Sequence, residues 1–297
     1  MLKSRSQTLT FLFSESFSST VATVLLSFSV LTVVGNSLVI ITIWKDPFKN
    51  LKGTANYLIL NLAVSDLLVG FPSEFLFALL HWFPYRGITQ AAYTSMYLGF
   101  YASFLTILGL AVERLIVISS PLTSVDFLTN AYLTLGIFCI WLFAGLLAFC
   151  ALLGWDSFSY RIFIFDAVII PIIILLFACY ARIFVLVRRG LYRDLKTEAG
   201  REELTSLTRS AQVREKLKRK ERSVAFSVFI LYGLFAVCWT PSIVLENIDE
   251  FFGRSYVPYK YASILQVLTF LHPLLNPIAY SLRTVKFRRA LRKIICR

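Results

Sequence analysis

Histidine and charged residues are scarce in this chain, and each scarcity excludes a class of protein. Only 2 of the 297 residues are His, namely His81 and His272. An intramembrane enzyme needs a Ser-His, paired-Asp or metal constellation, and the sequence offers none, so we expect no enzyme. Charged residues make up only 16% of the chain and hydrophobic residues 57%, which is too apolar for a soluble domain of this length.

The hydrophobic residues gather in seven long stretches. Each is long enough for a helix that crosses a bilayer of ~30 Å, which takes roughly 20 residues. The sequence therefore predicts an all-α membrane protein whose seven transmembrane helices form one bundle. The stretches lie near residues 20–44, 54–80, 91–118, 131–153, 162–187, 223–248 and 259–282.

Acidic residues are fewer than basic ones, 17 against 30, and the basic excess lies on one side of the predicted membrane. Three alternate connections hold nearly all the loop Lys and Arg: residues 45–52, the segment 188–222 and the tail from Arg283. By the positive-inside rule this side is cytoplasmic and the N-terminus is extracellular. Topology and attraction to anionic membrane lipids explain the net charge. We therefore expect a multi-pass plasma-membrane protein with a cytoplasmic C-terminus and no nucleic-acid partner.

The segments outside the bundle are short. Residues 1–19 are too few for a folded extracellular domain, and 20–282 hold the spans, with 188–222 as the third cytoplasmic loop and helix extensions. Residues 283–297 have the pattern of a short amphipathic eighth helix on the membrane surface. Cys296 beside it is either a palmitoylation site or an unmodified thiol. None of the 5 cysteines falls in an outer loop, so we expect no extracellular disulfide.

Asp66 is a carboxylate in the middle of the second span, where it must be protonated, paired or bound to a cation. Asn36, Ser103, His272 and Asn276 come from other spans at similar depth. They predict either a structural polar network or a sodium or proton site. A proton-linked transporter using Asp66 and His272 is the alternative function. Such transporters have repeated halves and paired broken helices, and the sequence shows neither.

Two groups near the sixth span indicate a movable helix. Glu113-Arg114 ends the third span, and Glu221 at the start of the sixth can offer Arg114 a second carboxylate, forming a latch. Simple anchoring at the membrane boundary is the alternative. Trp239 stands beside the helix-bending Pro241, with Phe235 four residues before it, so the sixth helix can hinge there.

The last span carries Asn276-Pro277-Ile278-Ala279-Tyr280 near its inner end. A proline removes one helical hydrogen bond and bends the helix. The amide of Asn276 and the phenol of Tyr280 need partners at that depth because water is not available there. Such a costly cluster in a membrane indicates a function.

In this order, the motifs resemble those of the rhodopsin-like (class A) G-protein-coupled receptor family across essentially the whole chain. Any one motif is weak, but seven in register are very specific. The motifs are Gly35-Asn36, Leu62-Ala63-x-x-Asp66, Glu113-Arg114, Trp141, Pro171, Cys238-Trp239-x-Pro241 and Asn276-Pro277-x-x-Tyr280.

The resemblance implies a receptor that captures an extracellular ligand and promotes nucleotide exchange on a heterotrimeric G protein, with arrestin as a further partner. It implies that the sixth helix swings outward, that Arg114 is released to meet the G protein and that Trp239 senses the ligand. Asp66, Ser103 and Asn276 match the family's sodium site, although His272-Pro273 replaces its usual polar pair. We expect no other cofactor.

The chain also departs from the family pattern. Thr89 stands where a disulfide-bonded Cys is usual, and Leu115 replaces the usual Tyr after the Arg. Phe270 stands where a retinal-binding opsin carries its lysine, and Met96 stands where amine receptors carry an Asp. These two positions exclude a conventional opsin and a conventional amine pocket. The absent disulfide, the short second outer loop and the tail at 293–296 are similar to the melanocortin and lysophospholipid/cannabinoid branch.

By position in the family, a mostly apolar set of side chains would line the ligand pocket, with acidic residues at its outer mouth. This combination suits a cationic peptide or an amphiphile; ordinary solvated rim charges are the alternative. The predicted pocket residues are Met96, Tyr97, Phe100, Phe163, Ser242, Ile243, Gln266 and Thr269, with Glu74 and Glu246 nearer the mouth.

Overall fold

A computed structural model describes most of the chain, and the described residues form helices only. It describes residues 2–83, 85–119, 130–153, 167–199, 233–235, 237–245, 247–248, 251–252, 259–283 and 285–296. The elements are α1 (Leu2–Lys45), α2 (Thr54–Leu68), the π-helical η1 (Val69–Glu74), α3 (Phe75–Leu80), α4 (Arg86–Ser119), α6 (Asn130–Leu152), α8 (Ala167–Ala199), α10 (Tyr259–Arg283) and α11 (Val285–Ile295).

Six helices in the described part are long and apolar enough to cross a membrane, and they coincide with six of the predicted spans. The first apolar span is Ser16–Lys45, but α1 already begins at Leu2, so most of the predicted outer segment 1–19 continues this helix. Of the predicted span 223–248, residues 233–235, 237–245 and 247–248 are described, and they are helical. The architecture agrees with the predicted bundle.

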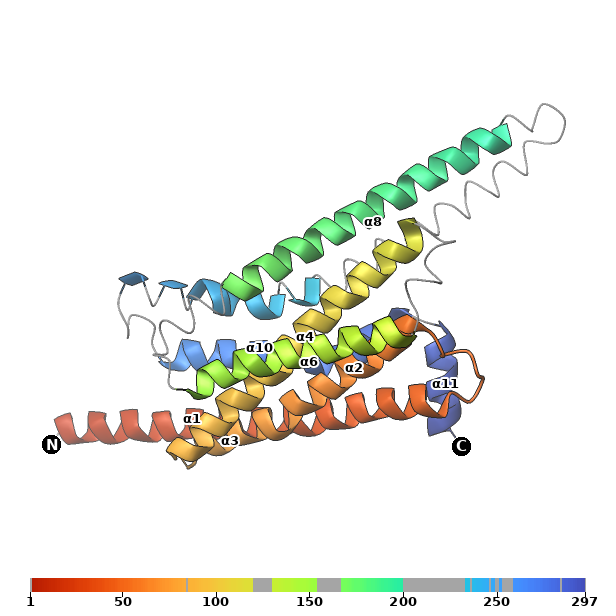
Figure 1. Ribbon diagram of the computed structural model, residues 1–297. Coiled ribbons are helices and arrows are strands. Elements are labelled where there is room, and N and C mark those ends of the chain that lie inside the picture. Colours follow the sequence, from red (N-terminus) through yellow and green to blue (C-terminus); the bar gives the residue numbers. More distant parts are fainter. Residues whose placement is uncertain are drawn as a thin grey trace.

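The helices run side by side, with the N-terminus at one end of the bundle and α11 at the other (Figure 1). Helix α4 is central because it packs against α2, α6 and α8, while α1 packs against α2 and α10. Helix α8 extends beyond its neighbours and ends at Ala199, inside the segment 188–222. The polar groups of α1, α2, α4 and α10 are therefore brought to one shared core.

The second span is bent at η1, which separates α2 from α3. Pro72 lies inside η1, and Phe71 before it has non-helical dihedral angles of φ −145° and ψ 117°. Because proline lacks an N–H and clashes with the preceding turn, the α-helical pattern is interrupted here by a kink. Ser73 and Glu74, which follow the bend, are both fully buried.

The predicted eighth helix is α11, which lies across the end of the bundle opposite the N-terminus, against α1 and α10 (Figure 1). Phe287 and Ala290 are buried on its apolar side. Arg288 donates a hydrogen bond to the carbonyl oxygen of Ser281 over 3.0 Å. The Lys293 ammonium lies 4.9 Å from the ring centroid of Phe48, a cation–π contact with the loop after α1.

Candidate functional site

Asp66 joins three helices in the centre of the bundle. Its side chain is fully buried. Ser103 on α4 donates a hydrogen bond to Oδ1 over 3.2 Å, and the Asn276 amide nitrogen on α10 donates to Oδ2 over 2.8 Å. The structure thus brings together the three residues predicted for a sodium site. Each carboxylate oxygen accepts one of these hydrogen bonds and keeps further lone pairs, so sodium binding at Asp66 stays a prediction.

The Gly35-Asn36 motif holds α1 against α10. The Asn36 amide nitrogen donates to the carbonyl oxygens of Thr32, over 3.0 Å, and Pro273, over 3.2 Å. A Cβ atom on Gly35 would lie only 3.2 Å from Cγ of Pro277, so the absence of a side chain at Gly35 permits this close approach. The first and last spans therefore meet beside Asp66, as their shared depth predicts.

Glu74 lies elsewhere than predicted. We expected it at the outer mouth, but its side chain is fully buried, and the Thr32 hydroxyl donates a long hydrogen bond of 3.4 Å to Oε1. The rim position is therefore wrong for Glu74, because this residue closes the bent segment η1 and lies against α1. Glu246, the other predicted mouth residue, lies outside the described residues.

Trp239 stands in an aromatic cluster that joins the sixth helix to α4. Its ring centroid lies 4.5 Å from that of Phe100 and 4.8 Å from that of Phe104, both edge-to-face. The Phe235 ring stacks on Trp239 with the centroids 6.2 Å apart, and it contacts Phe104 with the centroids 5.1 Å apart. Such edge-to-face pairs are a favoured aromatic geometry. The predicted hinge tryptophan is thus held mainly by two phenylalanines of α4 that are one helical turn apart.

The aromatic contacts continue outward from Phe100. The ring centroid of Phe270 lies 5.8 Å from that of Phe100 and 5.4 Å from that of Phe77. Phe77 contacts Tyr93 at 5.0 Å, and Tyr93 lies 6.2 Å from Tyr97. We call this series from Tyr93 to Trp239 the aromatic column. Phe77 and Tyr93 were not among the predicted site residues; the spacing of Tyr93 and Tyr97, four residues apart on α4, was the signal that the sequence offered.

Several predicted ligand residues lie beside this column. The hydroxyls of Ser242 and Thr269 are 2.8 Å apart and hydrogen-bonded, and both side chains are buried. Phe100 belongs to the column itself. Met96, Tyr97, Ile243 and Gln266 are partly buried, while Phe163 lies outside the described residues. The structure therefore brings Phe100, Ser242 and Thr269 into the interior.

Arg114 is paired with its own neighbour. Its Nε lies 3.3 Å from Oε2 of Glu113, with the Arg114 side chain 39% exposed and that of Glu113 8% exposed. Glu221, the predicted partner from the sixth helix, lies outside the described residues, as does the side chain of Tyr280. The latch across helices therefore stays a prediction, and the observed pair is local.

A second polar chain, absent from the predicted site, connects α2, α4 and α6. The Trp141 indole nitrogen donates to Oδ1 of Asn61 over 2.8 Å. Asn61 in turn donates to the Thr106 hydroxyl over 2.7 Å, and Thr106 donates to the carbonyl of Ala102. Trp141 was singled out by its motif, but nothing in the sequence distinguished Asn61 from other amides.

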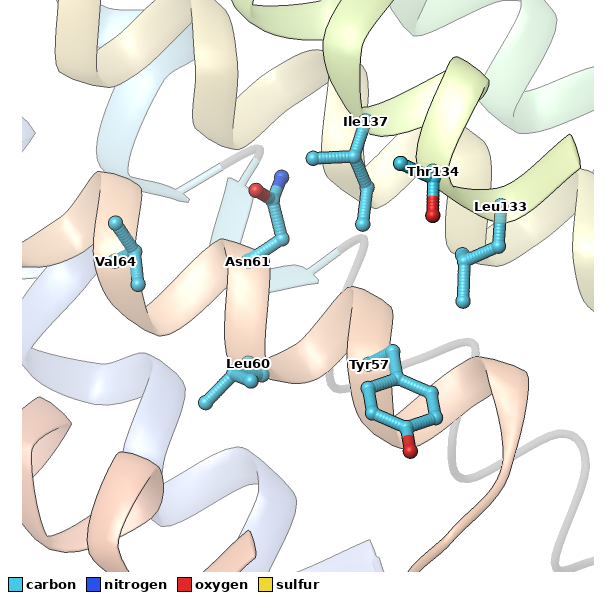
Figure 2. A pocket seen from close by; sticks show the side chains of 7 residues that line it. All are labelled: Tyr57, Leu60, Asn61, Val64, Leu133, Thr134 and Ile137. Atoms are coloured by element: carbon cyan, nitrogen blue, oxygen red, sulfur yellow. The ribbon is translucent and has the colours of Figure 1, made fainter. Parts of the chain in front are cut away.

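A cavity of about 320 Å³ lies between α2 and α6 next to this chain. Figure 2 shows the Asn61 side chain beside Ile137 at its wall. Both polar atoms of Asn61 already have partners in the Trp141–Thr106 chain, so the cavity is mainly apolar. Its lining residues are Tyr57, Leu60, Asn61, Val64, Leu133, Thr134 and Ile137. It is separate from the aromatic column.

Trp141→Phe is expected to destabilise the bundle by about 1–3 kcal/mol, because it leaves the buried Asn61 oxygen without its donor. Thermal unfolding of the detergent-solubilised protein measures this loss. The matched control is Trp44→Phe, since Trp44 is 82% exposed near the C-terminal end of α1. Equal unfolding temperatures for the two variants would show that the indole hydrogen bond contributes nothing.

Comparisons with known proteins agree with this geometry. The family model described as "7 transmembrane receptor (rhodopsin family)" matches residues 35–280. The chain is 26% identical over 319 residues to the Homo sapiens adenosine receptor A2a, covering 94% of this chain and 72% of that receptor. It is 24% identical over 304 residues to the Oryctolagus cuniculus alpha-1A adrenergic receptor (89% and 65% covered). It is 25% identical over 290 residues to Xenopus laevis melanopsin-B (89% and 52%).

The family match spans most of the chain and includes all the predicted motifs from Gly35 to Tyr280. It confirms the predicted receptor fold, and it gives no support to a proton-linked transporter. Membership at this level places the protein among receptors rather than enzymes. The melanocortin and lysophospholipid/cannabinoid branch stays a prediction. The chain belongs to the rhodopsin family of seven-transmembrane receptors, and it is a multi-pass G-protein-coupled receptor.

Proposed function

We propose that this receptor responds to an extracellular amphiphile with a largely apolar body. The aromatic column carries the proposal. Its rings run without interruption from Tyr93 through Phe77, Phe270 and Phe100 to Trp239. Ligand sites are mostly apolar with a few placed polar groups, and the hydrogen-bonded hydroxyls of Ser242 and Thr269 would supply those groups.

A cationic peptide fits these residues less well. The expectation of an acidic mouth rested partly on Glu74, and that carboxyl is buried against α1 and away from the rim. Met96 occupies the position at which an amine-binding Asp would stand. Among the described pocket residues the chemistry is mostly apolar surface with a few uncharged polar groups, those of Tyr97, Ser242, Gln266 and Thr269, which favours an amphiphile.

In the proposed mechanism, ligand contact moves Phe100, and Phe100 displaces Trp239. The two rings are only 4.5 Å apart, so one cannot shift far without the other. Trp239 lies two residues before Pro241, where the missing backbone hydrogen bond lets the sixth helix bend. The bend would open the cytoplasmic end of the bundle, release Arg114 and expose the surface that promotes nucleotide exchange. Asn276, Pro277 and Tyr280 would adjust in α10.

The cellular setting follows the same proposal. The receptor would stand in the plasma membrane with its N-terminus outside and its basic C-terminal segment on the cytoplasmic side, facing anionic lipids. The G protein, and arrestin after it, would bind at that side. Cys296 is exposed at the end of α11, where a palmitoyl chain would reinforce the membrane contact of this helix.

The test is nucleotide exchange on membranes that contain the receptor and a promiscuous G protein, with separate pools of amphiphiles, peptides and amines. We expect activation by the amphiphile pool. Phe100→Ala should lower the potency of the active compound about tenfold, which corresponds to ~1.4 kcal/mol of lost binding or coupling. The matched control is Phe138→Ala, because Phe138 is 61% exposed on α6 and contacts lipid. A response to cationic peptides alone, or equal losses in both variants, would contradict the proposed ligand class.

A further inference from the structure

A serine fastens the N-terminal part of α1 to the end of the second span. The Ser18 hydroxyl donates a hydrogen bond to the His81 carbonyl oxygen over 3.1 Å, and it lies 3.0 Å from Nδ1 of the same residue. His81 directly follows α3, just beyond the apolar span that ends at Leu80. These two contacts join residues 63 positions apart in the sequence, so they fix where α1 meets the end of α3.

The residue before this serine ties α1 to the last span. Phe17 is partly buried against the core of the bundle. The Lys260 ammonium, near the start of α10, lies 5.8 Å from the ring centroid of Phe17, which is a cation–π contact. We call Phe17, Ser18, His81 and Lys260 the clasp. It joins α1, α3 and α10 at the N-terminal end of the bundle.

The two helices that the clasp holds carry rings of the aromatic column. Phe77 lies on α3 four residues before His81, about one helical turn, and Phe270 lies on α10. Both rings are buried, and their centroids are 5.4 Å apart. Because buried side chains are closely packed, a movement of the end of α3 relative to α10 would change this contact. The clasp is therefore placed to position one end of the column.

His81 is the titratable member of the clasp. Histidine is the residue whose charge ordinarily changes between pH 5 and 8. The His81 side chain is partly buried, and burial lowers the pKa of its imidazole from the usual 6.5, because a positive charge is less well solvated there. Ser18 has one hydroxyl proton and donates it to the carbonyl oxygen, so Nδ1 would donate to Ser18 and Nε2 would take up a further proton. The closed clasp favours the neutral ring.

The ionisable side chains on the neighbouring elements carry both signs. Lys260 on α10 and Arg86, exposed at the start of α4, are positive, and a like charge nearby disfavours a charged His81 ring. Glu74 on η1 is buried and lies seven residues before His81, while the phenols of α4 titrate far above this range. Glu15 on α1 stands three residues before the clasp serine, with its side chain outside the described residues. A carboxylate there would favour the charged ring, so Glu15 is included in the test.

We propose that the clasp is proton-sensitive: acid charges His81, releases the N-terminal part of α1 from α3 and loosens the contact between Phe77 and Phe270. A ring free in water takes up its proton near pH 6.5, whereas the closed clasp resists it. The clasp is therefore intact above about pH 6.5 and is lost progressively as the pH falls below that value. Its effect on ligand binding rests on the proposed function, but its opening does not.

The first experiment follows the ring by NMR titration of the solubilised full chain labelled at histidine. The chain has 2 histidines, so the signal that disappears in His81→Asn is assigned. We expect the pKa of His81 to lie below 6.5 in the wild type and in Glu15→Gln, and closer to 6.5 in Ser18→Ala, because the released ring is better solvated. Ser27→Ala is the matched control, since the Ser27 hydroxyl donates within α1 to the Thr23 carbonyl oxygen over 2.8 Å. A wild-type pKa of His81 at or above 6.5, or the same value in Ser18→Ala, would overturn the proposal.

The second experiment measures the potency of an active amphiphile at pH 7.5 and pH 5.5. The variant is His81→Asn, whose amide keeps a donor for Ser18 but does not titrate. We expect potency to fall about threefold at the lower pH in the wild type, less than the tenfold per pH unit that full linkage to one proton allows, and to stay constant in the variant. Equal pH dependence in both would contradict the link between the clasp and the column. If no amphiphile activates the receptor at either pH, the proposed function fails, while the titration still decides whether the clasp exists.

Discussion

Arg114→Ala is expected to reduce G-protein nucleotide exchange by about tenfold or more, equivalent to at least ~1.4 kcal/mol of lost coupling, while the protein still reaches the membrane. The structure gives two reasons. The Arg114 side chain is 39% exposed, so its removal leaves no large cavity. Among the described residues its ion-pair partner is the adjacent Glu113 at 3.3 Å, so this pair joins no two helices. Loss of exchange with normal expression would therefore report a signalling role.

The paired variant should have the opposite effect. Glu113→Gln removes the carboxylate that holds the guanidinium, and we expect it to raise exchange without ligand. Arg188→Ala is the control for loss of one positive charge, since Arg188 is exposed on α8. GTPγS exchange on membranes, normalised to receptor number, measures all three variants. Exchange by Arg114→Ala equal to that of wild type would contradict the predicted role of Arg114.

The spans and most of the polar core were predictable because the hydrocarbon of a membrane restricts which residues a helix can place in it. A helix in lipid must be apolar for its whole length, so the hydrophobic stretches mark the helices closely. A buried group such as Asp66 must find partners, and Ser103 and Asn276 were two of the four polar residues predicted at its depth. A requirement that holds for every residue of its kind inside a membrane can therefore be recognised in the sequence.

The position of Glu74 was not predictable in the same way. Glu74 was placed by its position in the family pattern, but the chain is kinked at Phe71 and Pro72, which changes which residues face the core. The pairing of Asn61 with Trp141 also depends on how closely α2, α4 and α6 approach, which no local pattern encodes. The position of Glu74 and the pairing of Asn61 with Trp141 were not predicted because both depend on local geometry.

The role of individual glycines also could not be predicted from the sequence. Gly99 and Gly109 both lie on α4 among apolar residues, and the sequence gives no reason to rank one above the other. In the structure, a Cβ atom on Gly99 would lie 2.6 Å from Cγ2 of Val69, 3.1 Å from the Ser65 carbonyl oxygen and 3.2 Å from the Val69 nitrogen. At Gly109 the nearest atom would be Cδ2 of Leu58, 3.9 Å away. Only Gly99 is required for the contact between α2 and α4.

Gly99→Ala is therefore expected to destabilise the receptor by about 2–3 kcal/mol, since overpacking of this kind forces backbone shifts. The backbone at Ser65 in α2 and at Val69, where η1 begins, cannot yield as a flexible side chain would. Those residues lie next to Asp66, so the shift should also disturb its hydrogen bonds to Ser103 and Asn276.

Gly109→Ala is the matched control and should change stability in the other direction. Alanine is favoured over glycine inside a helix by about 0.5–1 kcal/mol, and at 3.9 Å its methyl group makes only an ordinary contact. Thermal unfolding and cell-surface expression should therefore separate the two variants by sign. If Gly99→Ala proved as stable as Gly109→Ala, the close approach of α2 and α4 would be wrong, and with it the geometry that places Asp66 between Ser103 and Asn276.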